Sequence, residues 1–328
     1  MMKHIESYEN CSGVRNLFGK LLIVCNKILF ADGVRVKGIN AVDLVDFYNG
    51  DLHFNLESTL FQLNKFSKEP KMVLFVENSE SITQIEDDLF FCFTRISRRE
   101  FKYSVINSAY EVLWEEVNDK FIDVIGGKLV VTNRLDRREF WLRHVNGEII
   151  SHFQLPEGFN IFGNMEAENN TLFFTSYKEG NSFMLSTGVD LNTGVVKWNY
   201  EYSVPYETNF IATTYYEKLI YGLSKKFFQV FDPVKGEFLV DIQVDEALPD
   251  NLFPDVNRQA VADGRLWFVS GQGRTVNFGA FDIEKSEIDF IQSYPLSEDD
   301  QFDTPVYHDG KLHLRSIGSN TLYIFERE

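Results

Sequence analysis

Cysteine is scarce in this 328-residue chain, which has only Cys11, Cys25 and Cys92. An odd and scattered set without a C-x-x-C pair indicates neither a disulfide framework nor a zinc site. No stretch approaches the roughly 20 consecutive apolar residues of a membrane-spanning helix. The N-terminus also lacks an uninterrupted apolar signal-peptide core. We therefore expect a cytoplasmic protein that is not inserted in a membrane.

Sequence motifs of catalysis are also missing. There is no nucleophile elbow, no H-E-x-x-H helix and no phosphate-binding loop. The six histidines are scattered, and His308 and His313 flank a turn, where a structural or solvated role is favoured over metal ligation. These observations favour a protein that is not an enzyme and that uses no cofactor or metal.

Basic residues are outnumbered, with 32 Lys and Arg against 49 Asp and Glu and a net charge of −17. This charge opposes attraction to nucleic acid or to an anionic membrane surface. A protein partner with a basic surface fits better. Aromatic residues, in contrast, are abundant, with 31 Phe and 14 Tyr. Such side chains suit pleated, half-buried strands, so the composition favours β-structure over helix.

A short phrase recurs along the chain: a polar or glycine-containing turn, a leucine, and then a β-rich run. Successive leucines lie 37 to 47 residues apart. That spacing is close to the roughly 40 to 50 residues of a four-stranded propeller blade. Seven such anchors occur, at Leu52, Leu89, Leu129, Leu172, Leu219, Leu266 and Leu312.

The last repeat shows only three strands before the chain ends, and so lacks its outer strand. The segment KLLIVCNKILF, residues 20–30, is β-rich and precedes the first repeat. Using it as the missing strand removes two exposed sheet edges. We therefore predict an all-β fold: a single seven-bladed β-propeller of four-stranded blades spanning residues 1–328, whose N-terminal segment, residues 1–40, includes the strand that closes the last blade.

The fourth repeat contains GVDLNTGVVKW, residues 188–198. It resembles the A-x-D-x-x-T-G-x-x-x-W repeat of quinoprotein (PQQ-like, tryptophan-docking) β-propellers. In this pattern Asp190 starts a turn, Gly194 takes a positive φ, and Trp198 packs back on the sheet. Later repeats are weaker, with Phe290 where Trp is expected. Degenerate copies include Trp114, one residue early, and a shortened turn that ends at Gly147.

The resemblance covers about residues 80 to 328 and implies the fold more than the chemistry. Family members that are dehydrogenases bind a quinone, and many carry an adjacent cysteine pair beside it. Other members are assembly scaffolds with an N-terminal lipid. This chain has no adjacent cysteines and no lipobox before Cys11. The resemblance therefore points to a non-enzymatic member of the family.

An internal echo marks two turns: R-x-x-R-R-E-F occurs at residues 95–101 and again at 134–140. Both lie between the second and third strands of their repeats. In a propeller these turns emerge on the same face as the crossings from one blade to the next. Arginine forks suit carboxylates or phosphates. The alternative is a solvated hairpin tip, because Glu100 and Glu139 lie beside the arginines.

The late crossings are acidic instead. One of them carries Asp250 and Asp255 around the apolar Leu252 and Phe253, and another carries Asp299 and Asp300. A Ca²⁺ site is disfavoured because the spacing lacks alternating ligands. A solvated acidic loop remains the alternative. The candidate partner-binding residues are thus Arg98, Arg99, Arg137, Arg138, Asp250, Leu252, Phe253, Asp255, Asp299 and Asp300.

The leading hypothesis is a non-catalytic, cytoplasmic protein-binding propeller that engages one protein partner. By analogy, we expect that a bacterial protein of this kind is an immunity protein or antitoxin that neutralises an effector. One alternative is an enzyme or small-ligand receptor, in which carboxylates or histidines from different inner strands converge on the central channel. A scaffold in a larger assembly is another alternative.

Overall fold

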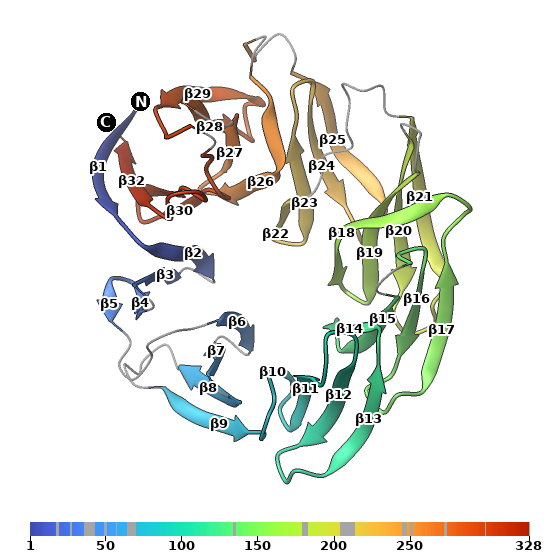
Figure 1. The fold of residues 1–328 in the computed structure, drawn as a ribbon. Coiled ribbons are helices and arrows are strands. Elements are labelled where there is room, and N and C mark those ends of the chain that lie inside the picture. Colours follow the sequence, from blue (N-terminus) through green and yellow to red (C-terminus); the bar gives the residue numbers. More distant parts are fainter. Residues whose placement is uncertain are drawn as a thin grey trace. The chain divides into compact units, whose positions relative to one another are not determined.

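The structure is a computed structural model, and it describes residues 1–17, 20–26, 28–35, 43–48, 51–56, 58–63, 70–133, 136–178, 183–203, 214–244, 248–249, 252–271, 274–298 and 300–327. Its regular elements are β-strands in eight four-stranded antiparallel sheets, the blades of a β-propeller (Figure 1). Two compact units divide the chain: Met1–Ala41 with Val204–Asp232 and Glu237–Glu328, and Val42–Ser203 with Pro233–Gly236. Each is described by itself below. No helix long and apolar enough to cross a membrane occurs in the described part of the chain.

The first unit holds four blades. In the order of pairing within each sheet, they are β1 (Met2–Tyr8), β32 (Leu322–Arg327), β31 (Lys311–Arg315) and β30 (Val306–His308); β2 (Cys11–Leu17), β3 (Lys20–Cys25), β4 (Ile28–Ala31) and β5 (Val34–Arg35); β22 (Thr214–Tyr216), β23 (Leu219–Leu223), β24 (Phe227–Asp232) and β25 (Glu237–Gln243); and β26 (Pro254–Ala262), β27 (Arg265–Ser270), β28 (Val276–Asp282) and β29 (Glu287–Tyr294).

The second unit also holds four blades, each made of consecutive strands. They are β6 (Asp43–Tyr48), β7 (Asp51–Leu56), β8 (Thr59–Leu63) and β9 (Lys71–Phe75); β10 (Ser81–Glu86), β11 (Leu89–Arg95), β12 (Phe101–Asn107) and β13 (Val112–Asn118); β14 (Phe121–Ile125), β15 (Lys128–Thr132), β16 (Glu139–Arg143) and β17 (Ile149–Gln154); and β18 (Phe159–Glu168), β19 (Thr171–Lys178), β20 (Phe183–Asp190) and β21 (Val196–Ser203).

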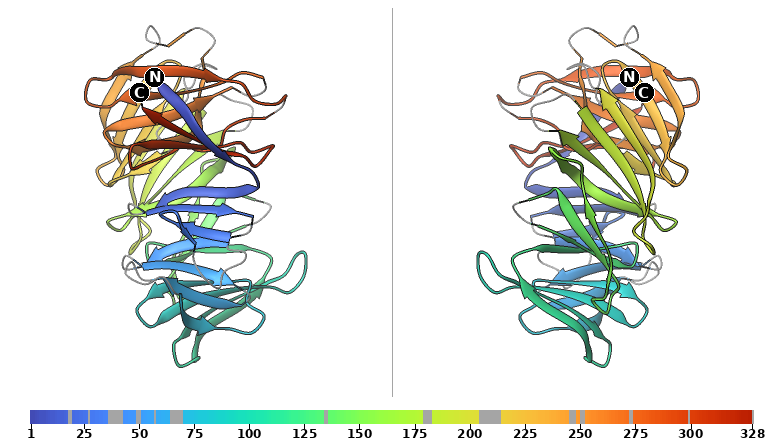
Figure 2. Two further views of the ribbon diagram at one scale, coloured as in Figure 1. Left: turned by 90° about the vertical axis from the view of Figure 1, so that its left-hand side faces the viewer. Right: turned by 90° about the vertical axis from the view of Figure 1, so that its right-hand side faces the viewer.

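The recurring phrase of the sequence is the hairpin that joins the first two strands of a blade. Asp263 and Gly264 have φ of 53° and 67°, and Asp309 and Gly310 have 49° and 76°. Two successive positive φ values define a type I′ turn, whose twist matches that of the flanking strands. Such turns also precede Leu129, Leu172 and Leu219. Each of the seven anchor leucines lies on the second strand of its blade, so the predicted recurrence of this strand is confirmed. The twist of the sheets is visible in Figure 2.

A bulge recurs where the third strand of a blade pairs with the outer strand, and it places one side chain at the same register position in several blades. In β21 this residue is Trp198, paired with Gly188. Its indole N–H donates to the Pro233 carbonyl at 2.8 Å. A Cβ on Gly236, where φ is +73°, would lie 2.2 Å from the indole. The residues at this position include Leu74, Trp114, Ser151, Trp198, Val240 and Phe290.

The predicted packing of an outer-strand tryptophan on a turn is therefore present, but other residues replace the tryptophan in several blades. Trp114 covers Gly147 of the next blade, where an added Cβ would lie 2.1 Å from the ring. Phe290 occupies the tryptophan position, as the sequence predicts, opposite Ala280. In β17 the position holds Ser151, which contacts Gly194. The outer strands β13, β17 and β21 thus contact a turn of the next blade, through large or small side chains.

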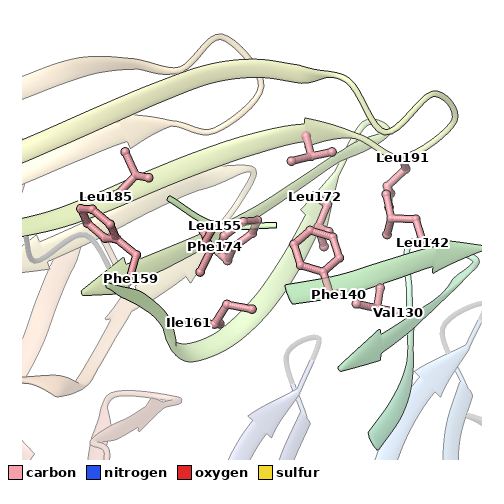
Figure 3. Packing of buried hydrophobic residues seen from close by; sticks show 11 residues of the cluster. Val130, Phe140, Leu142, Leu155, Phe159, Ile161, Leu172, Phe174, Leu185 and Leu191 are labelled. Atoms are coloured by element: carbon pink, nitrogen blue, oxygen red, sulfur yellow. The ribbon is translucent and has the colours of Figure 1, made fainter. Parts of the chain in front are cut away.

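Buried aliphatic and aromatic residues fill the space between neighbouring sheets. Figure 3 shows one such layer, in which Phe140 and Leu142 of β16 meet Leu172 and Phe174 of β19. The rings of Phe140 and Phe174 meet edge to face at 5.3 Å. Burying aromatic side chains in such layers removes a large apolar area from water, which stabilises the stack of blades.

The predicted number of blades and the predicted closing strand are wrong. Eight sheets are present, and the segment at residues 20–30 forms β3 and β4 of an additional blade. The last blade is closed by β1, which pairs antiparallel with β32 from Met2 opposite Arg327 to Tyr8 opposite Leu322. The prediction that an N-terminal strand completes the last blade is right, but that strand is Met2–Tyr8.

The expectation that the cysteines form no disulfide is also wrong. Cys11 on β2 and Cys25 on β3 are opposite each other in the register and form a disulfide with a Cα–Cα distance of 4.0 Å. Their separation of 14 residues gave no sequence pattern, because it is the hairpin that brings them together. Cys92 is a buried free thiol, and burial raises its pKa to about 12.

Candidate partner-binding surface

The first pair of predicted arginines, Arg98 and Arg99, lies in the turn between β11 and β12, and both side chains are exposed. The turn is tight because the Ser97 hydroxyl accepts hydrogen bonds from the N–H groups of Arg99 at 3.3 Å and Glu100 at 3.1 Å. Glu100 also accepts, through its carbonyl, the N–H of Ile96 at 3.0 Å. The backbone thus presents both arginines at the tip.

The second pair, Arg137 and Arg138, occupies the equivalent turn between β15 and β16 and is also exposed. Arg138 binds Asp136 through Nε and Nη2, both at 2.6 Å, and this hydrogen-bonded pair lowers the pKa of Asp136. The Arg137 carbonyl accepts the Ile161 N–H of the next blade at 2.9 Å. This turn is therefore held to its neighbour, and Arg134 lies outside the described residues.

Three apolar side chains lie exposed at the same end of these blades, and we missed them in the sequence. Ile96 is 53% exposed, Phe121 44% and Tyr177 41%. Phe121 is the first residue of β14, and its ring stacks on that of Phe101 at 5.9 Å. The only sequence signal is an apolar residue at a strand end. We call the set of Ile96, Arg98, Arg99, Phe121, Arg137, Arg138 and Tyr177 the turn-end surface.

The predicted apolar residues of the acidic crossing before β26 behave differently from one another. Leu252 is 2% exposed and packs with Phe268 and Phe281 in the core, so its side chain offers no surface to a partner. Phe253 is 61% exposed, and the Lys225 ammonium lies 6.0 Å from its ring centre. Asp250 lies outside the described residues.

The two remaining acidic candidates of the first unit are engaged by the protein. Asp255 lies 3.5 Å from the Arg258 guanidinium. Asp300 is only 3% exposed and accepts hydrogen bonds from the Ser316 hydroxyl and from the N–H groups of Gly318 at 2.7 Å and Gln301 at 2.8 Å. Burial alone raises the pKa of Asp300, but these bonds outweigh it and lower the pKa. Asp299 lies outside the described residues.

The alternative that uses inner strands finds two carboxylates in the second unit. Asp123 on β14 pairs with Val130, and Glu166 on β18 pairs with Phe173, which are equivalent positions of adjacent blades. Desolvation by the surrounding protein raises the pKa of both the Asp123 and the Glu166 carboxyl groups. Across the described ranges, no three His, Cys, Asp or Glu side chains are grouped as metal ligands.

A buried histidine and an open cleft also lie in the first unit. Burial lowers the pKa of His313 to about 4, so its ring is neutral at physiological pH, and Nδ1 lies 3.3 Å from the Val306 carbonyl. In the first unit, a cleft of about 390 Å³ is lined by amide and hydroxyl side chains. Its lining residues are Asn10, Ser12, Asn26 and Asn320.

Comparison with known proteins supports the fold alone. No family model matches the sequence, and no curated protein matches it. Among solved structures, BamB from Moraxella catarrhalis is similar over 100% of this chain and 98% of its own, with 11% identity and a TM-score of 0.54. AztD from Citrobacter koseri is similar over 90% of this chain and 88% of its own, with 12% identity and a TM-score of 0.52.

Proposed function

We propose that this chain is a non-catalytic, protein-binding β-propeller, a non-enzymatic relative of the quinoprotein-type propellers, and that one partner contacts its turn-end surface. The observation that carries this proposal is the exposure of Ile96, Phe121 and Tyr177 among arginines at one end of three successive blades. Aromatic residues and arginine are enriched at the centre of protein interfaces.

The apolar members of this surface supply the driving force. Fully burying a side chain of this size is favourable by roughly 1.5 to 3 kcal/mol. Phe121 already rests on Phe101, so its ring loses little freedom when a partner covers it. A rigid aromatic anchor of this kind is typical of an interface hot spot.

The arginines supply selectivity. Arg99 and Arg137 are exposed and reach carboxylates with planar, bidentate geometry. The chain as a whole carries a charge of −17, which attracts a basic protein from a distance. The partner is therefore a protein that is basic overall and has a local acidic patch where it meets the turns. Neutralisation of a bacterial effector is one role that requires such a surface.

The disulfide bears on where the protein works. Structural disulfides persist in oxidising compartments and are rare in the cytoplasm. Cys11 and Cys25 are buried and paired, which favours an oxidising compartment over the cytoplasmic location expected from the sequence. Labelling of free thiols with a maleimide under denaturing conditions at lysis tests this, with Cys92 as the positive control for labelling. Failure of Cys11 and Cys25 to react supports the oxidising compartment. Labelling of both supports the cytoplasm.

The test of partner binding uses a benzophenone side chain in place of Phe121, with the same group in place of Val195 as the control. Val195 is exposed as well, but it lies in the turn between β20 and β21 at the other end of its blade. We expect a partner to be captured in cells by the Phe121 probe and not by the Val195 probe.

Affinity measurements on the captured partner complete the test. Phe121→Asp with Tyr177→Asp should weaken binding by about a hundredfold, because two anchors are lost. Arg98→Glu with Arg99→Glu should mainly slow association and change its salt dependence. Equal capture from both probe positions, or an unchanged Kd in the Phe121/Tyr177 variant, would show that the partner binds elsewhere.

A further inference from the structure

The outer strand of the blade β10–β13 has an edge that no other strand occupies in the part of the chain described. β13 is the last strand in the order β10-β11-β12-β13 and pairs only with β12. From Trp114 to Asn118 the pairing with β12 is regular. The opposite side of β13 therefore presents a straight run of backbone N–H and C=O groups, which is a template for a further strand.

The side chains of β13 are apolar where solvent meets them. Val112, Leu113 and Val117 are between 46% and 56% exposed. Trp114 is directed into the molecule and covers Gly147, which fixes which side chains of the strand face outward. An edge strand that carries exposed branched aliphatic residues is unusual, since edges are commonly blunted by charge.

Acidic groups accompany these apolar residues. Glu111, Glu115 and Asp119 are exposed at intervals of four residues along the segment. Glu115 lies 2.8 Å from Lys102, with both side chains about two-fifths exposed, so solvent weakens the pair. Glu116 is held by the Arg143 guanidinium at 2.5 Å. The edge is thus apolar and negatively charged.

Other outer strands of the described residues share parts of this combination. β25 has Leu239 between exposed Glu237 and Asp241, and β29 has no exposed large apolar side chain in its span of Glu287–Tyr294. β1 exposes Ile5 and Tyr8, and β9 exposes Met72 and Phe75. The edge of β13 differs from these in having three exposed branched aliphatic side chains among carboxylates.

We propose that β13 is a strand-addition site that binds an extended segment of a partner protein in which every second residue, on the face that meets Glu115 and Val117, is in turn basic and apolar. The segment pairs with β13 as a fifth strand of the blade. Its backbone supplies hydrogen bonds, its apolar side chains cover Leu113 and Val117, and its lysines or arginines meet Glu111, Glu115 and Asp119.

The charge pattern argues against a second copy of the chain as the occupant. In an antiparallel pair of two β13 strands, Glu115 and its neighbours would lie against the same carboxylates of the other copy. Like charges placed opposite one another destabilise a strand pair. A basic segment meets no such repulsion.

The probe is a short synthetic peptide, Lys-Thr-Val-Thr-Lys-Thr-Val-Thr-Lys, which places lysine and valine in turn on one face of a strand, and the version with glutamate in place of lysine is its control. We expect the lysine peptide to bind and to slow hydrogen exchange at Val112–Asn118. Val117→Lys and Leu113→Lys should each weaken binding by about tenfold, through lost contact and like charge. Val195→Lys, also an exposed apolar site, should leave affinity unchanged. Near-ultraviolet circular dichroism checks that each variant is folded.

Two results would overturn this proposal. The first is exchange protection outside β13, or equal weakening by the Val195 control. The second is a doubled mass in light scattering that Val117→Lys abolishes, which would identify a second copy as the occupant. The Phe121→Asp/Tyr177→Asp variant should bind the peptide normally, so failure at β13 and failure of the turn-end surface are distinguishable.

Discussion

The turns between the second and third strands are basic in both units, but their cations have different tasks. In the first unit, Lys225 donates to the Leu248 carbonyl at 2.8 Å and to the Pro249 carbonyl, and Arg274 lies 2.9 Å from Glu298. The Lys225 contacts hold the crossing before β26 to the turn, whereas the Arg274–Glu298 pair is largely exposed. In the second unit, Arg99 and Arg137 are exposed at the same end of their blades as Phe121.

The difference shows how one kind of turn acquires two roles. Where the crossing is long, as before β26, its Leu248 and Leu252 are buried and its carbonyls accept hydrogen bonds from the lysine of the turn. Where the crossing is short, as between β13 and β14, no such cover exists and an aromatic residue remains at the surface. Structural turns should therefore respond to substitution through stability, and the turn-end surface through binding.

Leu252→Ala is expected to have the largest effect on stability. The side chain is almost fully buried against Phe268 and Phe281. Removing it leaves a cavity and should lower the free energy of unfolding by about 3 kcal/mol. Denaturant unfolding measures this cost. Phe253→Ala, one residue further on, is the matched control and should cost much less, since Phe253 is exposed. An equal loss of unfolding free energy in the two variants would show that Leu252 and Phe253 do not differ in their contribution to stability.

Asp300→Asn should come next, at about 2 kcal/mol at neutral pH, because one amide cannot accept every hydrogen bond that the carboxylate accepts. The pKa of Asp300 is lowered by folding, so its contribution is present above the pKa of the unfolded state. It is lost as pH falls through the folded pKa. The difference between wild type and variant should therefore shrink below about pH 4. A difference independent of pH would assign the cost to packing.

Lys225→Met should cost about 1 kcal/mol, because two crossing carbonyls lose their donor while the aliphatic stem is retained. Hydrogen exchange at Leu248 and Leu252 should accelerate in this variant. Unchanged exchange there would mean that the crossing is held without the lysine.

Arg98→Glu with Arg99→Glu should have the smallest effect on stability, within about 0.5 kcal/mol, because exposed surface substitutions rarely matter for folding. The melting temperature measures this. A clear loss of stability would show that these arginines are structural, as Lys225 is, and would remove them from the turn-end surface.

The repetitive part of the fold was readable from the sequence because local chemistry repeats with it. The anchor leucine recurs on the second strand of seven blades, five times after a turn with two positive φ values. The Asp190–Trp198 motif also places its docking side chain at the predicted register. The blade β2–β5 was not predicted because its Leu21 precedes Leu52 by only 31 residues, which is shorter than the spacing of the other repeats. Its β5 is also a strand of two residues, Val34–Arg35.

The site was less readable because burial depends on distant partners. Asp300 and Asp255 look alike in the sequence, yet Asp300 is buried by Ser316 and Gly318, which lie far along the chain. Leu252 and Phe253 are adjacent, and only the packing of β27 and β28 separates a core residue from an exposed one. The echo of arginines located the turns but not the apolar residues beside them.

Hydrogen–deuterium exchange of the complex with the captured partner shows whether the partner binds the turn-end surface. A partner on the turn-end surface should protect the backbone around Ile96–Arg99, Phe121 and Arg137–Arg138 together, and leave the crossing at Leu248–Leu252 unchanged. Protection confined to the first unit, with Phe121 exchanging as in the free protein, would show that the partner does not bind the turn-end surface.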